Sequence, residues 1–126
     1  MTAQLERVEQ TIFAGDPRGI PGNCLQAAVA TILGLRLEMV PHFVAIPGDS
    51  WWDFYVAFVR AHGREIQIAD DDDEPVIATG MSPRGVSHAV VMHRGVVIDP
   101  HPSQSGLVDV QRMYRFACIE REAVTA

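Results

Sequence analysis

Apolar residues recur at helical spacing in two segments of the N-terminal half. The first segment covers residues 24–33, after a Pro-Gly-Asn break at residues 21–23 and before a glycine. The second covers residues 51–62 and follows Asp49 and Ser50, which are residue types that cap helices. The pattern therefore predicts two short helices. The small side chains of the first helix favour close approach of a neighbouring element.

Aromatic side chains are concentrated in the second predicted helix. Trp51, Phe54, Tyr55 and Phe58 recur at near-helical spacing, which predicts that they pack together as part of the core. Trp52 falls outside this stripe. We therefore expect Trp52 to line a cleft that binds a substrate.

The C-terminal half has the pattern of β-strands. Apolar and polar residues alternate in short runs that are separated by Gly, Pro and Asp. His93-Arg94-Gly95 has the length and the glycine of a hairpin turn. On the last strand, Tyr114, Phe116 and Cys118 share one face, which predicts that Cys118 is a core residue. The predicted strands cover residues 64–69, 76–79, 87–92, 95–99 and 113–120, and residues 8–13 form either a short strand or an extended arm.

The order of these elements predicts an α+β fold. A chain of 126 residues with 48% apolar residues is expected to form a single domain over residues 1–126. Helices come first and antiparallel strands follow. We therefore expect the N-terminal helix that carries Cys24 to pack on a C-terminal antiparallel sheet.

Charge and cysteine content argue against several classes of protein. The net charge is −6 and all ten basic residues are scattered arginines, so we expect no nucleic-acid partner. No apolar run reaches membrane-spanning length and no signal peptide precedes the chain as written, so we expect no membrane partner and a cytoplasmic location. Cys24 and Cys118 lie far apart in very different contexts, which is not the pattern of a disulfide framework and favours reduced thiols. The acidic run at residues 70–74 lacks the glycine of a calcium loop and predicts a solvated turn.

Cys24 is the first candidate for chemistry because it opens the first predicted helix. There the thiol feels the positive end of the helix dipole and the unpaired backbone N–H groups, which favour the thiolate and lower its pKa. A nucleophilic role follows from this expectation. The alternative is that Cys24 is a small core residue, as most free cysteines are.

A base and an orienting acid are available on the predicted hairpin. His88 begins an otherwise apolar strand, and Asp99 ends the antiparallel partner strand. The hairpin turn brings residues near 88 and 99 opposite each other, so Cys24, His88 and Asp99 are expected to form a catalytic triad. Taken separately, His88 has the alternative of a hydrogen-bonded strand-end histidine, and Asp99 that of an Asp-Pro turn former.

Acyl transfer also needs donors for the developing oxyanion. The backbone N–H of Cys24 supplies one, and a side-chain amide is the usual second donor. Gln10 is our candidate because it is the nearest upstream glutamine in an ordered-looking segment. Asn23 and Gln26 compete for this role, and Asn23 also fits a cap or loop position.

Two further residues are expected at the rim of the cleft. Arg84 lies just before His88 and is placed to pair with a substrate carboxylate, with a surface salt bridge as the alternative. His101 follows Asp99 and is expected to line the same cleft. A metal site built from Cys24, His88, Asp99 and His101 lacks any short paired-ligand spacing, so we expect no metal and no cofactor.

Taken together, these motifs resemble a known superfamily. A glutamine upstream, Gly22-Asn23-Cys24 opening a helix of small residues, a strand that starts His88-Ala-Val-Val, and Asp99-Pro-His-Pro-Ser after a hairpin are similar to papain-like cysteine peptidases. The resemblance is closest to the compact leader peptidases of bacteriocin exporters and to related uncharacterised bacterial and phage proteins. It implies a papain-like fold, Cys24 as nucleophile, His88 as general base, Asp99 as orienting acid and Gln10 as the oxyanion amide.

The expected activity is that of a thiol-dependent peptidase or amidase, which acts on a peptide or small amide through an acyl-enzyme. An acyltransferase that uses the same triad is the nearest enzymatic alternative. A papain-like module that binds a partner without catalysis is the alternative from another class. The pattern indicates no particular oligomeric state.

Overall fold

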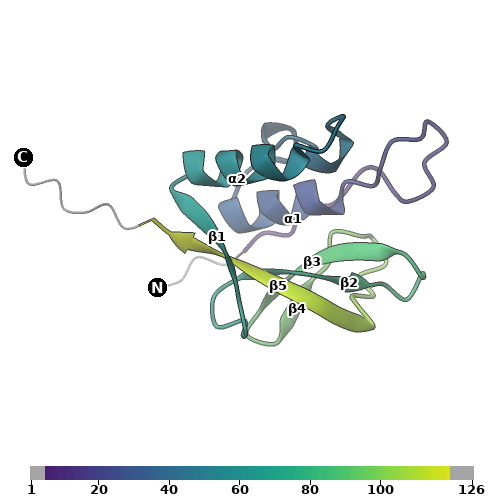
Figure 1. The fold of residues 1–126 in the computed structure, drawn as a ribbon. Coiled ribbons are helices and arrows are strands. Elements are labelled where there is room, and N and C mark those ends of the chain that lie inside the picture. Colours follow the sequence, from purple (N-terminus) through teal and green to yellow (C-terminus); the bar gives the residue numbers. More distant parts are fainter. Residues whose placement is uncertain (1–4, 120–126) are drawn as a thin grey trace, which may run out of the picture.

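The computed structural model describes residues 5–119 and shows two helices and one five-stranded antiparallel sheet. This confirms the α+β class. Both helices lie on one side of the sheet (Figure 1). In chain order the elements are α1 (Cys24–Leu33), the 3-10 helices η1 (Leu37–Met39) and η2 (Phe43–Ala45), α2 (Trp51–Ala61), β1 (Arg64–Ile68), β2 (Val76–Met81), β3 (Ser87–His93), β4 (Val96–Ile98) and β5 (Asp109–Cys118).

The last strand lies in the interior of the sheet. The strand order is β1-β5-β2-β3-β4, so β5 pairs with both β1 and β2 although the chain reaches it last. Residues 8–13 form no strand and run as the extended arm, which was one of the two sequence predictions. None of the helices in residues 5–119 is long and apolar enough to cross a membrane.

Helix α1 packs closely on the sheet because its buried face is built from small residues. Ala27, Ala28 and Ala30 are completely buried, and Ala28 and Ala30 belong to a core cluster with Ala89 and Val91 of β3. Alanine keeps the distance between a helix and its neighbour short without leaving voids. This close packing places the first turn of α1 beside the start of β3.

Helix α2 confirms part of the predicted aromatic stripe. Tyr55 is buried, and Trp51 and Phe58 are partly buried against the same core. Phe54 is 54% exposed and does not belong to the stripe, because the inward face follows residues 51, 55 and 58. Ser50 occupies the N-cap position, but its side chain makes no capping hydrogen bond, contrary to the prediction.

The prediction for Cys118 was wrong. Phe116 is buried as expected, but Cys118 is exposed. Cys118 is the last residue of β5 and pairs with Arg64 at the start of the edge strand β1. The alternation along β5 is therefore correct, but the strand extends beyond the part of the sheet that the core covers.

The β3–β4 hairpin agrees with the turn predicted from the sequence. His93 pairs with Val96, so Arg94 and Gly95 form a two-residue loop, and both have positive φ angles of 50° and 80°. This is the backbone of the type I′ turns that join twisted strands. The acidic run at residues 70–74 stabilises the turn, because Asp72 accepts hydrogen bonds from the backbone N–H groups of Arg94 and Gly95.

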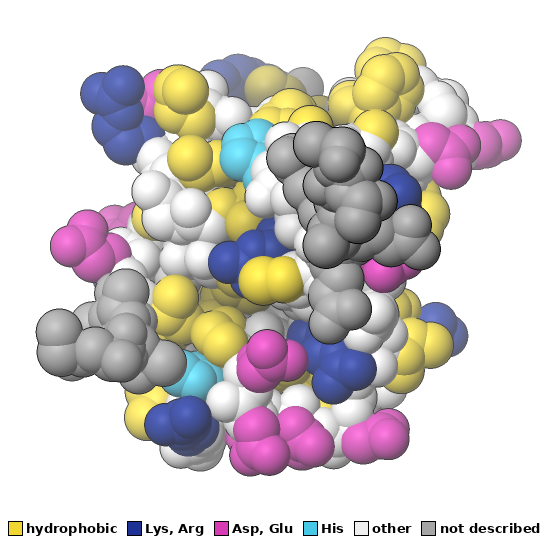
Figure 2. Space-filling model, turned by 90° about the vertical axis from the view of Figure 1, so that its left-hand side faces the viewer, with side chains coloured by type: hydrophobic (Ala, Val, Ile, Leu, Met, Phe, Trp, Pro, Cys, Tyr) yellow, Lys and Arg dark blue, Asp and Glu magenta, His cyan; other side chains and the backbone are white. Residues whose placement is uncertain are grey.

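Arginine side chains are dispersed over the surface. Figure 2 shows one face of the described residues, on which arginines stand apart among hydrophobic and acidic side chains. Within residues 5–119, four arginines form an ion pair with a carboxylate that is close in the sequence. In each pair at least one of the two side chains is well exposed. On the part of this face that the described residues form in Figure 2, the arginines do not join into a continuous track.

Gly80 is required where β2 meets β5. The pairing of these strands shifts between Thr79 and Gly80, and the carbonyl of Asp109 closes over Gly80. A Cβ at position 80 would lie 1.8 Å from that carbonyl oxygen, so no side chain fits. Gly80 also pairs with His88 on β3. A change here therefore displaces the strand that carries His88.

We predict that Gly80→Ala lowers the free energy of unfolding by about 3 kcal/mol, because the β2–β5 pairing must open to admit a methyl group. Gly48→Ala is the matched control. Gly48 has a φ of 87° but open space around its Cβ position, so only backbone strain of about 1 kcal/mol is expected. Urea denaturation of both variants measures the difference. Equal destabilisation would show that the close approach at Gly80 is not a constraint.

Candidate active site

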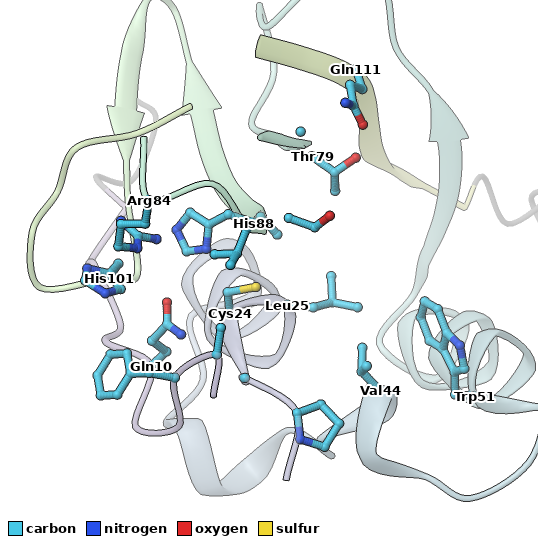
Figure 3. Close-up of a pocket in the computed structure, with 18 residues that line it drawn as sticks. Gln10, Cys24, Leu25, Val44, Trp51, Thr79, Arg84, His88, His101 and Gln111 are labelled. Carbon is cyan, nitrogen blue, oxygen red and sulfur yellow. The ribbon is translucent and has the colours of Figure 1, made fainter. Parts of the chain in front are cut away.

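A cavity of about 660 Å³ opens between the helices and the part of the sheet where β2 ends and β3 begins. Its lining includes Cys24 from α1, His88 from β3 and Gln10 from the N-terminal arm (Figure 3). Arg84 and His101 line it as well. The structure thus brings five of the seven predicted site residues to the wall of one cavity.

His88 and Asp99 form a short, buried hydrogen bond. His88 Nε2 lies 2.6 Å from Asp99 Oδ1, and the two residues are only 5% and 1% exposed. The hairpin register pairs Val91 with Ile98, which makes Asp99 a diagonal neighbour of His88 on the same side of the two strands. The predicted base and its orienting acid therefore meet as the hairpin implied.

The carboxylate of Asp99 accepts three hydrogen bonds. Besides the bond to His88, Oδ1 accepts the backbone N–H of His101 at 2.8 Å and Oδ2 accepts that of Gly106 at 2.8 Å. Burial raises the pKa of Asp99, but these three hydrogen bonds and the charge of His88 outweigh burial and hold the pKa below its usual value. Asp99 is therefore ionised at neutral pH.

The ionised carboxylate fixes the tautomer of His88. A carboxylate only accepts hydrogen bonds, so in the neutral form of His88 the proton lies on Nε2 and Nδ1 is the basic atom. Nδ1 makes no hydrogen bond within residues 5–119. The ring thus offers a free basic nitrogen in the wall of the cavity that Cys24 also lines.

Cys24 is the first residue of α1, as predicted, but its pKa moves in the opposite direction from the prediction. Burial raises the pKa of the thiol, and the backbone N–H groups of Ala89, Leu25 and Cys24 itself only partly offset this effect. Loss of hydration is thus larger than the stabilisation by the helix terminus. The thiol is neutral at neutral pH and needs a base before it can attack.

Figure 3 shows the Cys24 side chain beside the His88 ring, at the middle of the cavity. The two side chains form no hydrogen bond in this conformation of residues 5–119, and the sulfur is turned toward the Leu25 side of the cavity. Cys24 has a single side-chain torsion, so a rotamer change alone redirects its sulfur.

Gln10 reaches the cavity from the N-terminal arm and is 5% exposed. Its backbone N–H donates to the carbonyl of Pro100, and its Nε2 donates to the carbonyl of Ile12 at 2.9 Å. The second hydrogen on Nε2 stays free for another acceptor. In Figure 3 the nitrogen faces Cys24 and the oxygen faces His101. The predicted oxyanion amide is therefore placed beside the thiol.

Asn23 and Gln26, the competing amides, hold the chain in place instead. Asn23 Oδ1 accepts the backbone N–H groups of Thr11 and Ile12, and its Nδ2 donates to Thr11 Oγ1 and Gln26 Oε1. Gln26 Nε2 in turn donates to the carbonyls of Leu37 and Val40. This buried network fixes the arm that carries the oxyanion candidate to the start of α1.

Trp52 does not line the cavity, contrary to our expectation. Its ring packs edge-on against Tyr55 and Tyr114, on the side of α2 that faces β5. Trp51 lines the cavity instead, because helix α2 turns residue 51 toward Val44 and Leu25. Trp52 lines a separate, smaller cavity of about 360 Å³ beside Tyr114.

Two residues that support the site gave no signal in the sequence. Arg7 donates from Nε to the carbonyl of Asp99 at 2.6 Å and from Nη2 to that of His101 at 3.0 Å. Gly106 supplies one of the N–H groups on the Asp99 carboxylate. The contacts of Arg7 join residues more than 90 positions apart, whereas that of Gly106 closes the loop after Asp99. The described residues include no group of three or more His, Cys, Asp or Glu side chains arranged to hold a metal ion.

We predict that the Asn23 network is essential for stability. Asn23→Ala leaves the N–H groups of Thr11 and Ile12 without their acceptor and is expected to lower the free energy of unfolding by about 2 to 4 kcal/mol. Thr11→Val removes only one hydrogen bond of the network and should cost about 1 kcal/mol. Urea denaturation tests this order. A larger loss for Thr11→Val would contradict it.

We predict that Asp99 makes stability depend on pH in the acid range. Its folded pKa is lowered, so its contribution is fully present above about pH 4, the ordinary carboxyl pKa, and is lost as the pH falls through the lower folded value. Asp99→Asn removes this titration. The free energy of unfolding of the wild type should thus fall more steeply on acidification than that of Asp99→Asn, as measured by urea denaturation at a series of pH values. Parallel curves would refute the assignment.

Comparison of the chain with family models, with curated proteins and with solved structures found no match. The functional assignment therefore depends on the chemistry of the residues around the cavity.

Proposed function

We propose that the protein is a thiol-dependent hydrolase of the peptidase or amidase type, built on a papain-like arrangement of α1 and the sheet. The observation that carries this proposal is the buried His88–Asp99 pair, joined at 2.6 Å in the wall of the cavity that Cys24 lines. A carboxylate that fixes one ring nitrogen and leaves the other free is the arrangement that general-base catalysis needs.

In the proposed acylation step, His88 Nδ1 removes the proton from the Cys24 thiol as the sulfur attacks the carbonyl carbon of an amide. The raised pKa of the thiol makes this base necessary. The imidazolium that forms is stabilised by Asp99. It then gives its proton to the leaving nitrogen as the carbon–nitrogen bond breaks, and a thioester on Cys24 remains.

The negative charge on the carbonyl oxygen is stabilised by two groups in this proposal. One is the backbone N–H of Cys24, because the first N–H groups of a helix have no partner within it. The other is Gln10 Nε2, which has a free hydrogen and whose nitrogen faces Cys24 in Figure 3. Water then attacks the thioester with His88 as base, releases the acid and restores the thiol. An amine acceptor in place of water would give acyl transfer through the same intermediate.

The proposal predicts that Cys24 is acetylated by p-nitrophenyl acetate with a stoichiometric burst of nitrophenolate, and that mass spectrometry finds the acetyl group on Cys24. His88→Gln retains a donor to Asp99 but has no basic nitrogen, so acetylation should slow by about 10² to 10⁴-fold without loss of the fold. Cys118→Ser is the matched thiol control and should leave the burst unchanged.

Acetylation of Cys24 at the rate of a free thiol, unaffected by His88→Gln, would refute the enzymatic proposal and favour the module that binds without catalysis. Circular dichroism of each variant separates a chemical effect from unfolding.

A further inference from the structure

The cavity has two ends of different character on either side of Cys24 and His88 (Figure 3). One end is apolar and is formed by Leu25, Val44 and Trp51. Gln10, Arg84 and His101 form the other end, which we call the Arg84 end. A substrate that spans the cavity must therefore differ in polarity on the two sides of the reacting bond.

Arg84 is held in place but its charge is not neutralised. Its Nη1 donates to Ser103 Oγ at 3.1 Å and to Ser105 Oγ at 3.2 Å, and these hydroxyls lie 2.9 Å apart. Within residues 5–119 no carboxylate forms an ion pair with Arg84, although the chain carries a net charge of −6. Two hydroxyls thus orient the guanidinium while its remaining N–H groups are free for an anion.

Gln10 contributes a second unused group at the same end. Its Oε1 is buried and has no hydrogen-bond partner among the described residues. The carbonyl of Ile12 requires a donor, so this hydrogen bond fixes which end of the amide is Nε2 and leaves Oε1 at the other end. A buried acceptor without a protein partner needs a donor from water or from a ligand, so an N–H group of a ligand can bind here.

The Arg84 end lies on the side of the leaving group. In the proposed mechanism His88 gives its proton to the leaving atom, so the leaving group must lie on the same side of Cys24 as the His88 ring. The His101 ring is 6.1 Å from the His88 ring, centroid to centroid, and Arg84 adjoins His101 in Figure 3. Burial and the charge of Arg84 hold the pKa of His101 below its usual value, so Arg84 is the cation of this end at neutral pH.

We propose, on the basis of the proposed function, that the substrates are amides whose leaving group carries a carboxylate and an N–H group. Arg84 binds the carboxylate, and Gln10 Oε1 accepts a hydrogen bond from the N–H group. An amino acid or short peptide with a free carboxylate has this chemistry. The carbon–nitrogen bond breaks as the sulfur–carbon bond forms. The thiol proton passes through His88 to the leaving nitrogen, and water later replaces the sulfur on the acyl carbon.

The test compares two acetyl esters that differ only in the leaving group. 3-Acetoxybenzoate releases a phenol with a carboxylate, and 3-acetoxybenzamide releases a phenol with a neutral amide. The rate of acetylation of Cys24 is measured by mass spectrometry for each ester and divided by the rate with N-acetylcysteine in solution, which removes their difference in intrinsic reactivity. We expect the corrected rate for the carboxylate to be about tenfold higher.

Arg84→Gln should abolish this preference by slowing only the carboxylate ester. Arg36→Gln is the matched control, because Arg36 is exposed, does not line the cavity, and its loss changes the net charge equally. It should leave the preference intact. Equal corrected rates for the two esters in the wild type, or an equal effect of Arg84→Gln on both, would overturn the inference.

The two proposals fail in different ways. If Cys24 is acetylated with dependence on His88 but without preference for the carboxylate, the proposed function stands and the inference about Arg84 is wrong. If neither ester acetylates Cys24 faster than it acetylates N-acetylcysteine, the proposed function itself fails.

A further experiment distinguishes a carboxylate at a chain end from one on an acidic side chain. Acetylated protein is offered glycylglycine, glycylglycinamide or aspartyl-glycinamide as acceptors, because an acceptor amine occupies the site of the leaving group. Faster loss of the acetyl group with glycylglycine alone assigns a chain end, and faster loss with aspartyl-glycinamide assigns an acidic side chain. No advantage of either carboxylate over glycylglycinamide would count against the inference.

Discussion

The hydrogen bond between Asp99 and His88 is the interaction on which the rest of the site depends. A buried carboxylate is costly unless donors surround it, and Asp99 obtains three of them from the hairpin and from the loop that follows. Each donor fixes a different segment of the chain around one charge. One buried charge therefore depends on the short hairpin, the bend after Asp99 and the position of Gly106. As a result, one nitrogen of the His88 ring is hydrogen-bonded to Asp99 and the other is free.

The N-terminal arm connects this arrangement to the thiol. It has no regular secondary structure, yet Arg7 holds the carbonyls of residues 99 and 101, Gln10 bonds to Pro100, and Asn23 holds the arm against the start of α1. The arm thus bridges the helix that carries Cys24 and the loop that carries Asp99. An extended segment can do this because its backbone groups are free to bond on both sides, whereas a helix would have used them internally.

Local patterns in the sequence predicted the elements, and the hairpin predicted that residues 88 and 99 meet, because both depend on periodicity and on turn chemistry. Global contacts were not predictable in this way. The exposure of Cys118 depends on how far the core extends, and the choice between Trp51 and Trp52 depends on the rotation of one helix. The pKa of Cys24 was predicted in the wrong direction because the sequence shows the helix terminus but not the packing that removes water from the sulfur.

The placement of β5 between β1 and β2 has a consequence for biosynthesis. The ribosome releases β5 after the other four strands, so the middle of the sheet stays open until β5 has been synthesised. Pairings between residues so distant in the chain form slowly, because a long loop must close first. The cavity that Cys24 lines therefore lacks the part of its wall that Gln111 of β5 contributes until this strand has been synthesised.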